Sequence, residues 1–212
     1  MTYFHGNTNA RIVFNREVIF CTDDENGVGR KITVDTVTRG YSAPTITVSG
    51  SGILQINKMA QQDKTPQPPV SVIDTATLAY KPGASLGSGL TTVNAGATFQ
   101  VAESGEVALD GDLNLADGAK LKFTFSKRNI APVLDVAEKT VTLGENKALT
   151  VAIDGVKRPC AGRHVLTSGG KFAEAVVSLD GNHPKWVLGV GVNDDGNIYA
   201  DIKPIGTRII VR

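Results

Sequence analysis

The sequence predicts an all-β fold: a parallel β-helix, or β-solenoid, closed by a C-terminal β-hairpin cap. A nine-residue pattern carries this prediction and occurs at residues 93–101, 115–123 and, more loosely, 143–151. Each copy has an apolar residue, a turn containing Gly or Asn, and a short strand of alternating apolar and polar residues. The second copy lies 22 residues after the first, and the third lies 28 residues after the second. Short strands that return at intervals, with turns and no helix between them, are typical of a solenoid.

Composition and charge exclude several classes of partner. The chain has 212 residues, long enough for one sizeable core or for a solenoid with a terminal module. Its 22 basic and 21 acidic residues give a net charge of +1, and neither sign forms a long block. Such a mixed surface gives no electrostatic reason to bind nucleic acid or anionic lipid. The longest apolar runs fall far short of the roughly 20 residues of a membrane span.

The first elements are strands rich in β-branched residues, which pack well on a pleated surface. Residues 11–21 predict one long strand or two short ones, ended by a polar turn at 22–29. Residues 31–38 alternate with period two, and residues 45–56 contain two more alternating strands. Residues 57–69 are polar and contain three prolines, which cannot donate to a strand ladder. We therefore expect a loop at 57–69 that protrudes from the β stack.

The middle of the chain favours a solenoid over the alternative, a β-sandwich. A sandwich is usually built from strands of roughly 5–6 residues. The strands expected here have about three to five residues, and glycine-containing turns separate them. Stacking rungs of about 22 residues would bury the apolar residues of each strand in one continuous core. The expected strands are 91–93, 98–101, 107–109, 113–115 and 121–125.

The pattern changes near Gly155, and we expect solenoid rungs over residues 1–155 and a β-rich cap over 156–212. Residues 171–179 fit either a strand or one and a half helical turns. The strongest hairpin signal lies at 186–202, where two alternating strands flank an Asn-Asp-Asp-Gly turn.

Two further expectations concern the cap. Trp186, the only tryptophan, is the expected anchor between the cap and the last rung, at residues 143–151. A last short strand is expected at 207–211.

Three segments resemble the autotransporter-associated β-strand repeat of bacterial surface proteins. Residues 50–56 (GSGILQI) are similar to its first element, 91–101 (TTVNAGATFQV) to its second, and 107–115 (VALDGDLNL) to its third. The insertion at 57–69 departs from the short connection usual in that family. The resemblance implies a passenger-like β-helix of the bacterial cell surface, forming the C-terminal part of a larger repeat protein.

Two motifs could carry catalytic chemistry. Gly83–Gly87 matches the G-x-S-x-G nucleophile elbow, with Ser85 as the nucleophile, but that motif needs a helix after it. Turn and strand residues follow instead, so we interpret it as a glycine-rich corner. Asp110 and Asp112 could serve glycoside hydrolysis or bind Ca²⁺. We interpret them instead as a solvated turn, in which Asp favours local backbone hydrogen bonds, because no charged cluster with the repeat's period surrounds them.

The remaining candidates for ligand binding have ordinary explanations. Residues 193–197 (NDDGN) lack the context of a Ca²⁺ loop and predict a hairpin turn, and residues 23–25 predict an exposed acidic turn. The three histidines, His5, His164 and His183, have no partner at the spacing of a zinc site. Residues 168–171 lack the other residues of a phosphate loop, and 66–69 is a PxxP match that an extended loop explains.

The sequence offers no sign of a disulfide or of a catalytic site. Cys21 and Cys160 are expected to be unpaired, mostly buried thiols. We predict no catalytic, cofactor-binding or metal-binding residue, and no cofactor. The expected function is a non-catalytic structural or adhesive surface module; the alternatives are a carbohydrate-active β-helix enzyme of the pectate-lyase-like type, or a scaffold without known activity.

Partners and location follow from this reading. The expected partners are surface glycans or other extracellular proteins. We expect an extracellular or cell-surface location although the N-terminus shows no secretory signal, and a cytoplasmic location stays open as the alternative.

Overall fold

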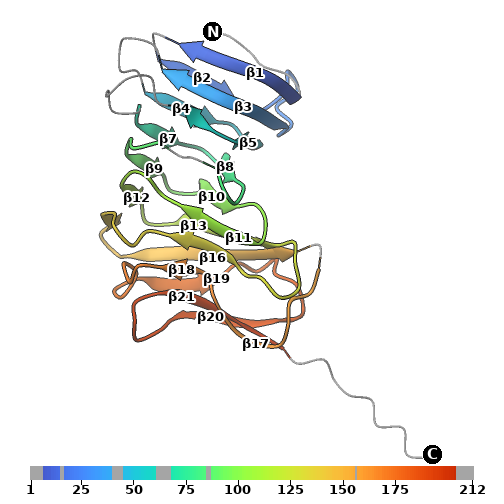
Figure 1. Ribbon diagram of the computed structural model, residues 1–212, viewed down its shortest axis with the longest axis vertical. Coiled ribbons are helices and arrows are strands. Elements are labelled where there is room, and N and C mark those ends of the chain that lie inside the picture. Colours follow the sequence, from blue (N-terminus) through green and yellow to red (C-terminus); the bar gives the residue numbers. More distant parts are fainter. Residues whose placement is uncertain are drawn as a thin grey trace, which may run out of the picture.

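The computed structural model describes residues 7–14, 17–39, 45–60, 68–84, 87–155 and 157–203. Across these residues the secondary structure consists of strands and turns, with no helix among them. The strands β1 to β21 form four sheets. Three of these sheets are parallel, and the strands of each are stacked along the long axis of the molecule (Figure 1). The all-β class is therefore confirmed.

The parallel sheets contain nine, six and three strands, respectively. The nine-stranded sheet has the order β1-β3-β5-β8-β10-β13-β16-β19, with β6 also on β3. Its strands are β1 (Asn7–Phe14), β3 (Lys31–Arg39), β5 (Ile53–Ile56), β6 (Met59–Ala60), β8 (Thr77–Tyr80), β10 (Thr98–Val101), β13 (Ala119–Phe125), β16 (Ala148–Gly155) and β19 (Val176–Leu179). The six-stranded sheet contains β2 (Val18–Cys21), β4 (Ile46–Ser49), β7 (Val70–Val72), β9 (Thr91–Val93), β12 (Leu113–Leu115) and β15 (Val141–Leu143). The three-stranded parallel sheet contains β11 (Gly105–Ala108), β14 (Pro132–Asp135) and β18 (Thr167–Ser168).

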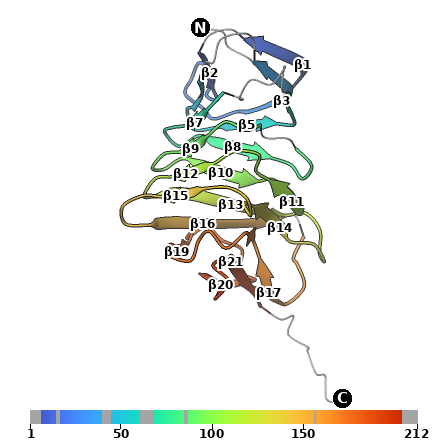
Figure 2. The same ribbon diagram turned by 60° about the vertical axis from the view of Figure 1, so that its left-hand side comes forward.

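The chain visits these sheets in a fixed order, and we call one such passage a circuit. It runs through β11, β12 and β13, and then through β14, β15 and β16. Equivalent strands of the two circuits pair in parallel: β11 with β14, β12 with β15 and β13 with β16. Figure 2 shows the strands of successive circuits stacked one below another.

The register confirms the predicted 22-residue step. Val93 pairs with Leu115, and Phe99 pairs with Leu121, both in parallel strands. The third copy of the pattern behaves differently. Leu115 pairs with Leu143, 28 residues later, but Leu121 pairs with Val151, 30 residues later. The turn after β15 holds two extra residues, and Lys147 in that turn adopts a positive φ of 54°.

The core consists of columns of inward-pointing side chains, one from each successive strand. In the nine-stranded sheet one column contains five in-register residues that are at most 1% exposed: Leu54, Leu78, Phe99, Leu121 and Val151. Fully burying such a side chain contributes about 1.5–3 kcal/mol relative to leaving it in water. Alternation within each strand sends the intervening polar side chains to the outer face of the sheet.

The last part of the chain combines a parallel continuation with an antiparallel sheet. β18 pairs with β14, and β19 pairs with β16, so two of the stacked sheets continue past residue 155. β17 (Gly162–Val165), β20 (Val187–Val192) and β21 (Ile198–Ile202) form the antiparallel sheet. Its β20–β21 hairpin confirms the prediction for 186–202. The division into units 1–155 and 156–212 stays a prediction.

The antiparallel sheet is joined to the stack by hydrogen bonds. The Ile198 N–H donates to the Thr167 hydroxyl over 2.8 Å, and the Leu166 N–H donates to the Ile198 carbonyl over 2.8 Å. Trp186 is half-buried, and its ring packs edge-on against Phe125 with centroids 5.9 Å apart. Its aromatic partner thus lies at the end of β13, not in the predicted rung at 143–151. β13 is longer than its neighbour β10, and its last residue, Phe125, reaches the tryptophan that directly precedes β20.

Three other expectations meet the structure only in part. Within the predicted loop at 57–69, Met59–Ala60 forms β6 on β3 and Met59 is buried, while residues 61–67 lie outside the described residues. The ambiguous segment 171–179 consists of a turn at 171–174 followed by the strand β19. The strand expected at 207–211 also lies outside the described residues.

Candidate functional site

A polar groove on the outer face of the nine-stranded sheet is the candidate site. Its floor is formed by side chains of four neighbouring strands, β8, β10, β13 and β16. Thr77 on β8 pairs with Thr98 on β10, which pairs with Lys120 on β13, so these side chains form one row across the sheet. Lys122 stands two residues beyond Lys120 on the same outer face of β13.

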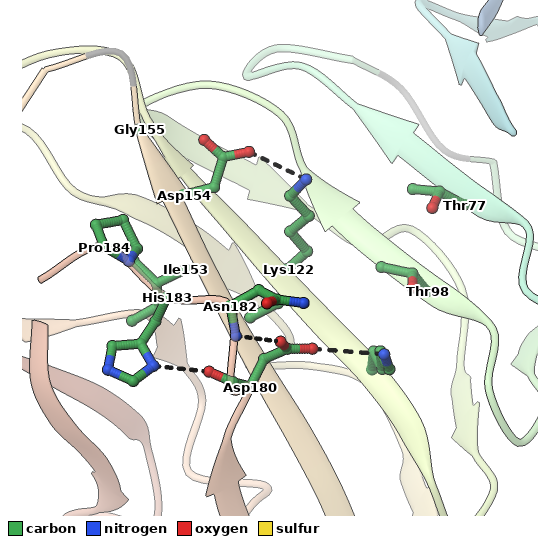
Figure 3. A pocket seen from close by; sticks show the side chains of 12 residues that line it. Thr77, Thr98, Lys122, Ile153, Asp154, Gly155, Asp180, Asn182, His183 and Pro184 are labelled. Carbon is green, nitrogen blue, oxygen red and sulfur yellow. Dashed lines mark hydrogen bonds and ion pairs between the residues drawn. The ribbon is translucent and has the colours of Figure 1, made fainter. Parts of the chain in front are cut away.

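The segment that follows β19 forms the wall of the groove. The Asp180 carboxylate accepts a hydrogen bond from the Asn182 N–H over 2.9 Å, which closes a tight turn. The His183 Nδ1 lies 2.8 Å from the Asp180 carbonyl oxygen. Figure 3 shows how this turn places Asp180, Asn182 and His183 beside the strand that carries Lys122.

The groove has a volume of about 540 Å³, and two ion pairs cross its floor. The Lys120 ammonium lies 3.4 Å from the Asp180 carboxylate, and the Lys122 ammonium lies 3.0 Å from the Asp154 carboxylate. Two positive and two negative groups therefore balance within one open surface (Figure 3).

The electrostatics of Asp180 follow from these contacts. The hydrogen bond from the Asn182 N–H lowers the pKa of Asp180, and the nearby Lys120 ammonium lowers it further. The carboxylate is therefore ionised at neutral pH and accepts hydrogen bonds only. Together with the lysine ammonium donors and the threonine hydroxyls, it offers both donors and acceptors of hydrogen bonds in the groove.

The acidic pair of the sequence analysis lies elsewhere, in the turn between β11 and β12. The Asp112 carboxylate accepts a hydrogen bond from the Thr140 N–H over 2.9 Å, and Thr140 belongs to the next circuit. Asp110 is exposed on the same turn. A Cβ on Gly111, between the two, would lie 2.2 Å from the Gly89 carbonyl oxygen of the preceding circuit. The turn thus has a structural role in joining successive circuits.

Asp117 has the same structural role and was missed by the sequence analysis. Its carboxylate accepts hydrogen bonds from the N–H groups of Asn146 over 2.9 Å and of Ala148 over 3.1 Å, both one circuit later. The Asn146 N–H above all lowers the pKa of Asp117. The usable signal was the Asp-Gly of the repeat's own turn, because Asp readily binds neighbouring backbone N–H groups.

The other predicted positions separate into turns and isolated groups. Ser85 and His5 lie outside the described residues. The Asn193 side chain accepts a hydrogen bond from the Asn197 N–H over 2.8 Å, which confirms the hairpin turn at 193–197. At 23–25, Asp24 forms an ion pair with Arg30 at 2.6 Å; Asp23 and Asp24 are half-buried, and Glu25 alone of the three is exposed as predicted. Ser168 donates to the Asp135 carboxylate over 2.7 Å, within the parallel sheet.

The two described histidines lie in different surroundings, and the cysteines require a correction. His183 lines the groove, because the turn after β19 folds back over β13 and β16. His164 packs edge-on against Phe125 with ring centroids 5.6 Å apart. Both cysteines are free thiols, yet Cys160 is exposed and Cys21 only half-buried, so the expectation of burial is wrong. Within the described ranges, three or more His, Cys, Asp or Glu side chains nowhere gather as a metal site would require.

No family model matches this chain, and neither a curated protein nor a solved structure shows significant similarity to it. The resemblance to the autotransporter-associated repeat therefore rests on residues 50–56, 91–101 and 107–115 alone. In the part of the chain that the structure describes, no helix has the length and apolar character needed to cross a membrane.

Proposed function

We propose that this chain is a non-catalytic structural or adhesive surface module whose framework is a parallel β-helix. The stacking of equivalent strands supports the β-helix reading. Val93, Leu115 and Leu143 occupy one continuous parallel ladder, and every circuit returns to the six-stranded or the nine-stranded sheet, with the three-stranded sheet joining from β11 onward. Such a framework offers long, flat outer faces suited to spacing and to broad contact with a partner.

The observation that carries the adhesive role is the charge-balanced groove over β8, β10, β13 and β16. Lys120 and Lys122 are each paired with an aspartate, so the ionised groups of the floor sum to zero. An anionic ligand would have to displace an aspartate, and a cationic ligand would have to displace a lysine. A neutral ligand rich in hydroxyl groups could hydrogen-bond to both members of each pair without separating them. A neutral surface glycan is the ligand class that we propose for this groove.

The test is binding to a panel of immobilised neutral oligosaccharides, with matched variants. Asp180→Asn and Lys122→Met each remove one charge of the groove, whereas Lys81→Met breaks the exposed Lys81–Glu103 ion pair outside it. We expect the wild type and Lys81→Met to bind equally and the two groove variants to lose most of their binding. Binding by Asp180→Asn at wild-type strength, or no binding by the wild type to any neutral glycan, would exclude the adhesive role.

The same panel distinguishes the enzyme alternative. A carbohydrate-active β-helix enzyme would release shorter sugars or unsaturated ends from a polysaccharide, whereas a module would bind without any change of mass. Product release that disappears in Asp154→Asn would show that the groove is an active site. Stable binding with no product, measured by mass spectrometry over the same period, is the result that we expect.

The proposed extracellular or cell-surface location rests on the family resemblance. Antibody raised against the purified chain should label intact cells of the source organism and lose the signal after mild protease treatment of those cells. Labelling only after the cells are broken open would favour the third alternative, an intracellular scaffold without activity.

A further inference from the structure

The six-stranded sheet ends one circuit earlier than the two parallel sheets beside it. The nine-stranded sheet continues from β16 to β19, and the three-stranded sheet continues from β14 to β18. The six-stranded sheet stops at β15. Between β18 and β19, where the earlier circuits have a strand of this sheet, the chain forms a turn at 171–174 and buries Phe172 completely. One strand position beside β15 is therefore empty within the described part of the chain.

The backbone of β15 presents hydrogen-bonding groups toward this position. The Thr140 carbonyl and the Gly144 N–H bond to β12, which fixes the direction of the groups between them. Because backbone groups alternate along a strand, the N–H and C=O groups of Val141 and Leu143 point away from β12. Among the described residues these groups have no hydrogen-bond partner. They form a strand edge of the kind that accepts another strand.

A groove of about 340 Å³ runs along this edge. β15 forms one side with Val141 and Leu143, both half-buried apolar residues, and the exposed Thr142. The turn at 171–174 forms the other side. Stacked parallel strands continue beyond the groove at β18 and β19, so it is a recess in the stack and not a flat end. A flexible segment can enter such a recess, whereas the edge of a folded second copy would meet the strands around it.

The charges around the groove indicate the kind of segment that fits. Lys147 and Glu174 form an ion pair at the rim and neutralise each other. Lys171 also lines the groove and is exposed, with no ion-pair partner among the described residues. The rim thus carries one uncompensated positive charge, which favours an acidic segment. The half-buried Val141 and Leu143 favour apolar residues at alternate positions of that segment.

We propose that the groove beside β15 binds an extended, acidic peptide segment of a partner protein, which adds a strand to the six-stranded sheet. Main-chain hydrogen bonds to Val141 and Leu143 would hold the segment, and Lys171 would select for its carboxylate. This interaction is independent of the glycan groove, which lies on another sheet.

The probe is a fluorescent synthetic peptide with the sequence of residues 135–145, DVAEKTVTLGE, added to the whole chain. It contains the alternating segment of β15 itself and carries three carboxylates against one lysine. The control peptide has its acidic residues replaced by the matching amides. We expect saturable binding by fluorescence anisotropy, with weaker binding of the control. On binding, the amide hydrogen exchange of Val141 and Leu143 should slow.

Three variants locate the interaction. Val141→Pro removes an N–H that points into the groove while leaving the two ladder bonds at Thr140 and Gly144, and it should abolish binding. Lys171→Glu should weaken binding about two- to fivefold, the range for one exposed charge pair. Lys185→Glu makes the same change of charge at an exposed residue outside the groove and should leave binding unchanged.

Several results would overturn the proposal. One is the absence of saturable binding by the wild type; another is equal binding by Val141→Pro, checked by its melting curve to be folded. If that variant unfolds, unchanged exchange of the Val141 and Leu143 amides in the peptide-bound wild type decides against the proposal. A wild-type dimer that Lys171→Glu disrupts, seen by analytical ultracentrifugation, would assign the edge to a second copy instead.

Discussion

Replacing Gly111 by Ala tests the close stacking of successive circuits. The added Cβ would lie 2.2 Å from the Gly89 carbonyl oxygen and 2.8 Å from the Ser88 carbonyl carbon, both backbone atoms of the preceding circuit. Neither atom belongs to a side chain that could rotate away, so the two circuits must separate. Overpacking of this kind typically costs about 1–3 kcal/mol. For a chain of this size each kcal/mol lowers the Tm by about 2–4 °C.

The matched control is Gly181→Ala, because a Cβ at Gly181 meets no atom within 4 Å. Urea unfolding followed by circular dichroism gives the free energy of unfolding of both variants and the wild type. We expect Gly111→Ala to be destabilised by about 1–3 kcal/mol and Gly181→Ala to match the wild type or exceed it slightly. Equal free energies of unfolding for Gly111→Ala and the wild type would show that the two turns are not in close contact.

The buried column, the turn carboxylate Asp117 and the two thiols can each be tested by substitution. Phe99→Ala opens the buried column between Leu78 and Leu121 and should lower the free energy of unfolding by about 3–5 kcal/mol, measured with urea. The pKa of Asp117 is lowered from its ordinary value of 3.8 by backbone hydrogen bonds in the folded state. The Asp117 carboxylate therefore stabilises the folded chain fully above pH 3.8, and this stabilisation is lost as the pH falls through the folded-state pKa. Asp117→Asn should therefore be less stable than the wild type at pH 7, and the difference should shrink in acid; a gap that stays constant with pH would contradict this. Cys160 is exposed and Cys21 is half-buried, so a thiol reagent should label Cys160 quickly and Cys21 slowly. The fast phase of labelling should be absent from Cys160→Ser.

Much of the strand pairing could be predicted from local pattern alone. Val93 and Leu115 pair because each is the last apolar residue before an equivalent Gly-containing turn. Equal spacing between such turns brings equivalent residues of successive circuits side by side. The hairpin at 193–196 was similarly predictable, because Gly196 takes the positive φ, 72°, that its turn requires.

The candidate sites depended on contacts between distant residues. Lys120 and Asp180 lie 60 positions apart and meet only because the turn after β19 folds over the outer face of β13. The roles of Asp112 and Asp117 were hidden for the same reason: each carboxylate binds backbone of the circuit that follows it. A carboxylate in a turn sequence does not reveal whether water, a ligand or a neighbouring circuit will supply its donor.

Local sequence patterns were enough to predict the all-β class, the 22-residue pairing of β9 with β12 and β10 with β13, and the terminal hairpin. These features depend on the period of apolar residues and on turn chemistry, both of which are local. Contacts between distant residues set the two-residue slip after Leu143, the packing of Trp186 on Phe125, the groove at Lys120 and the open edge of β15. Each of these depends on where one circuit ends relative to the next, and that position is set by packing across the stack.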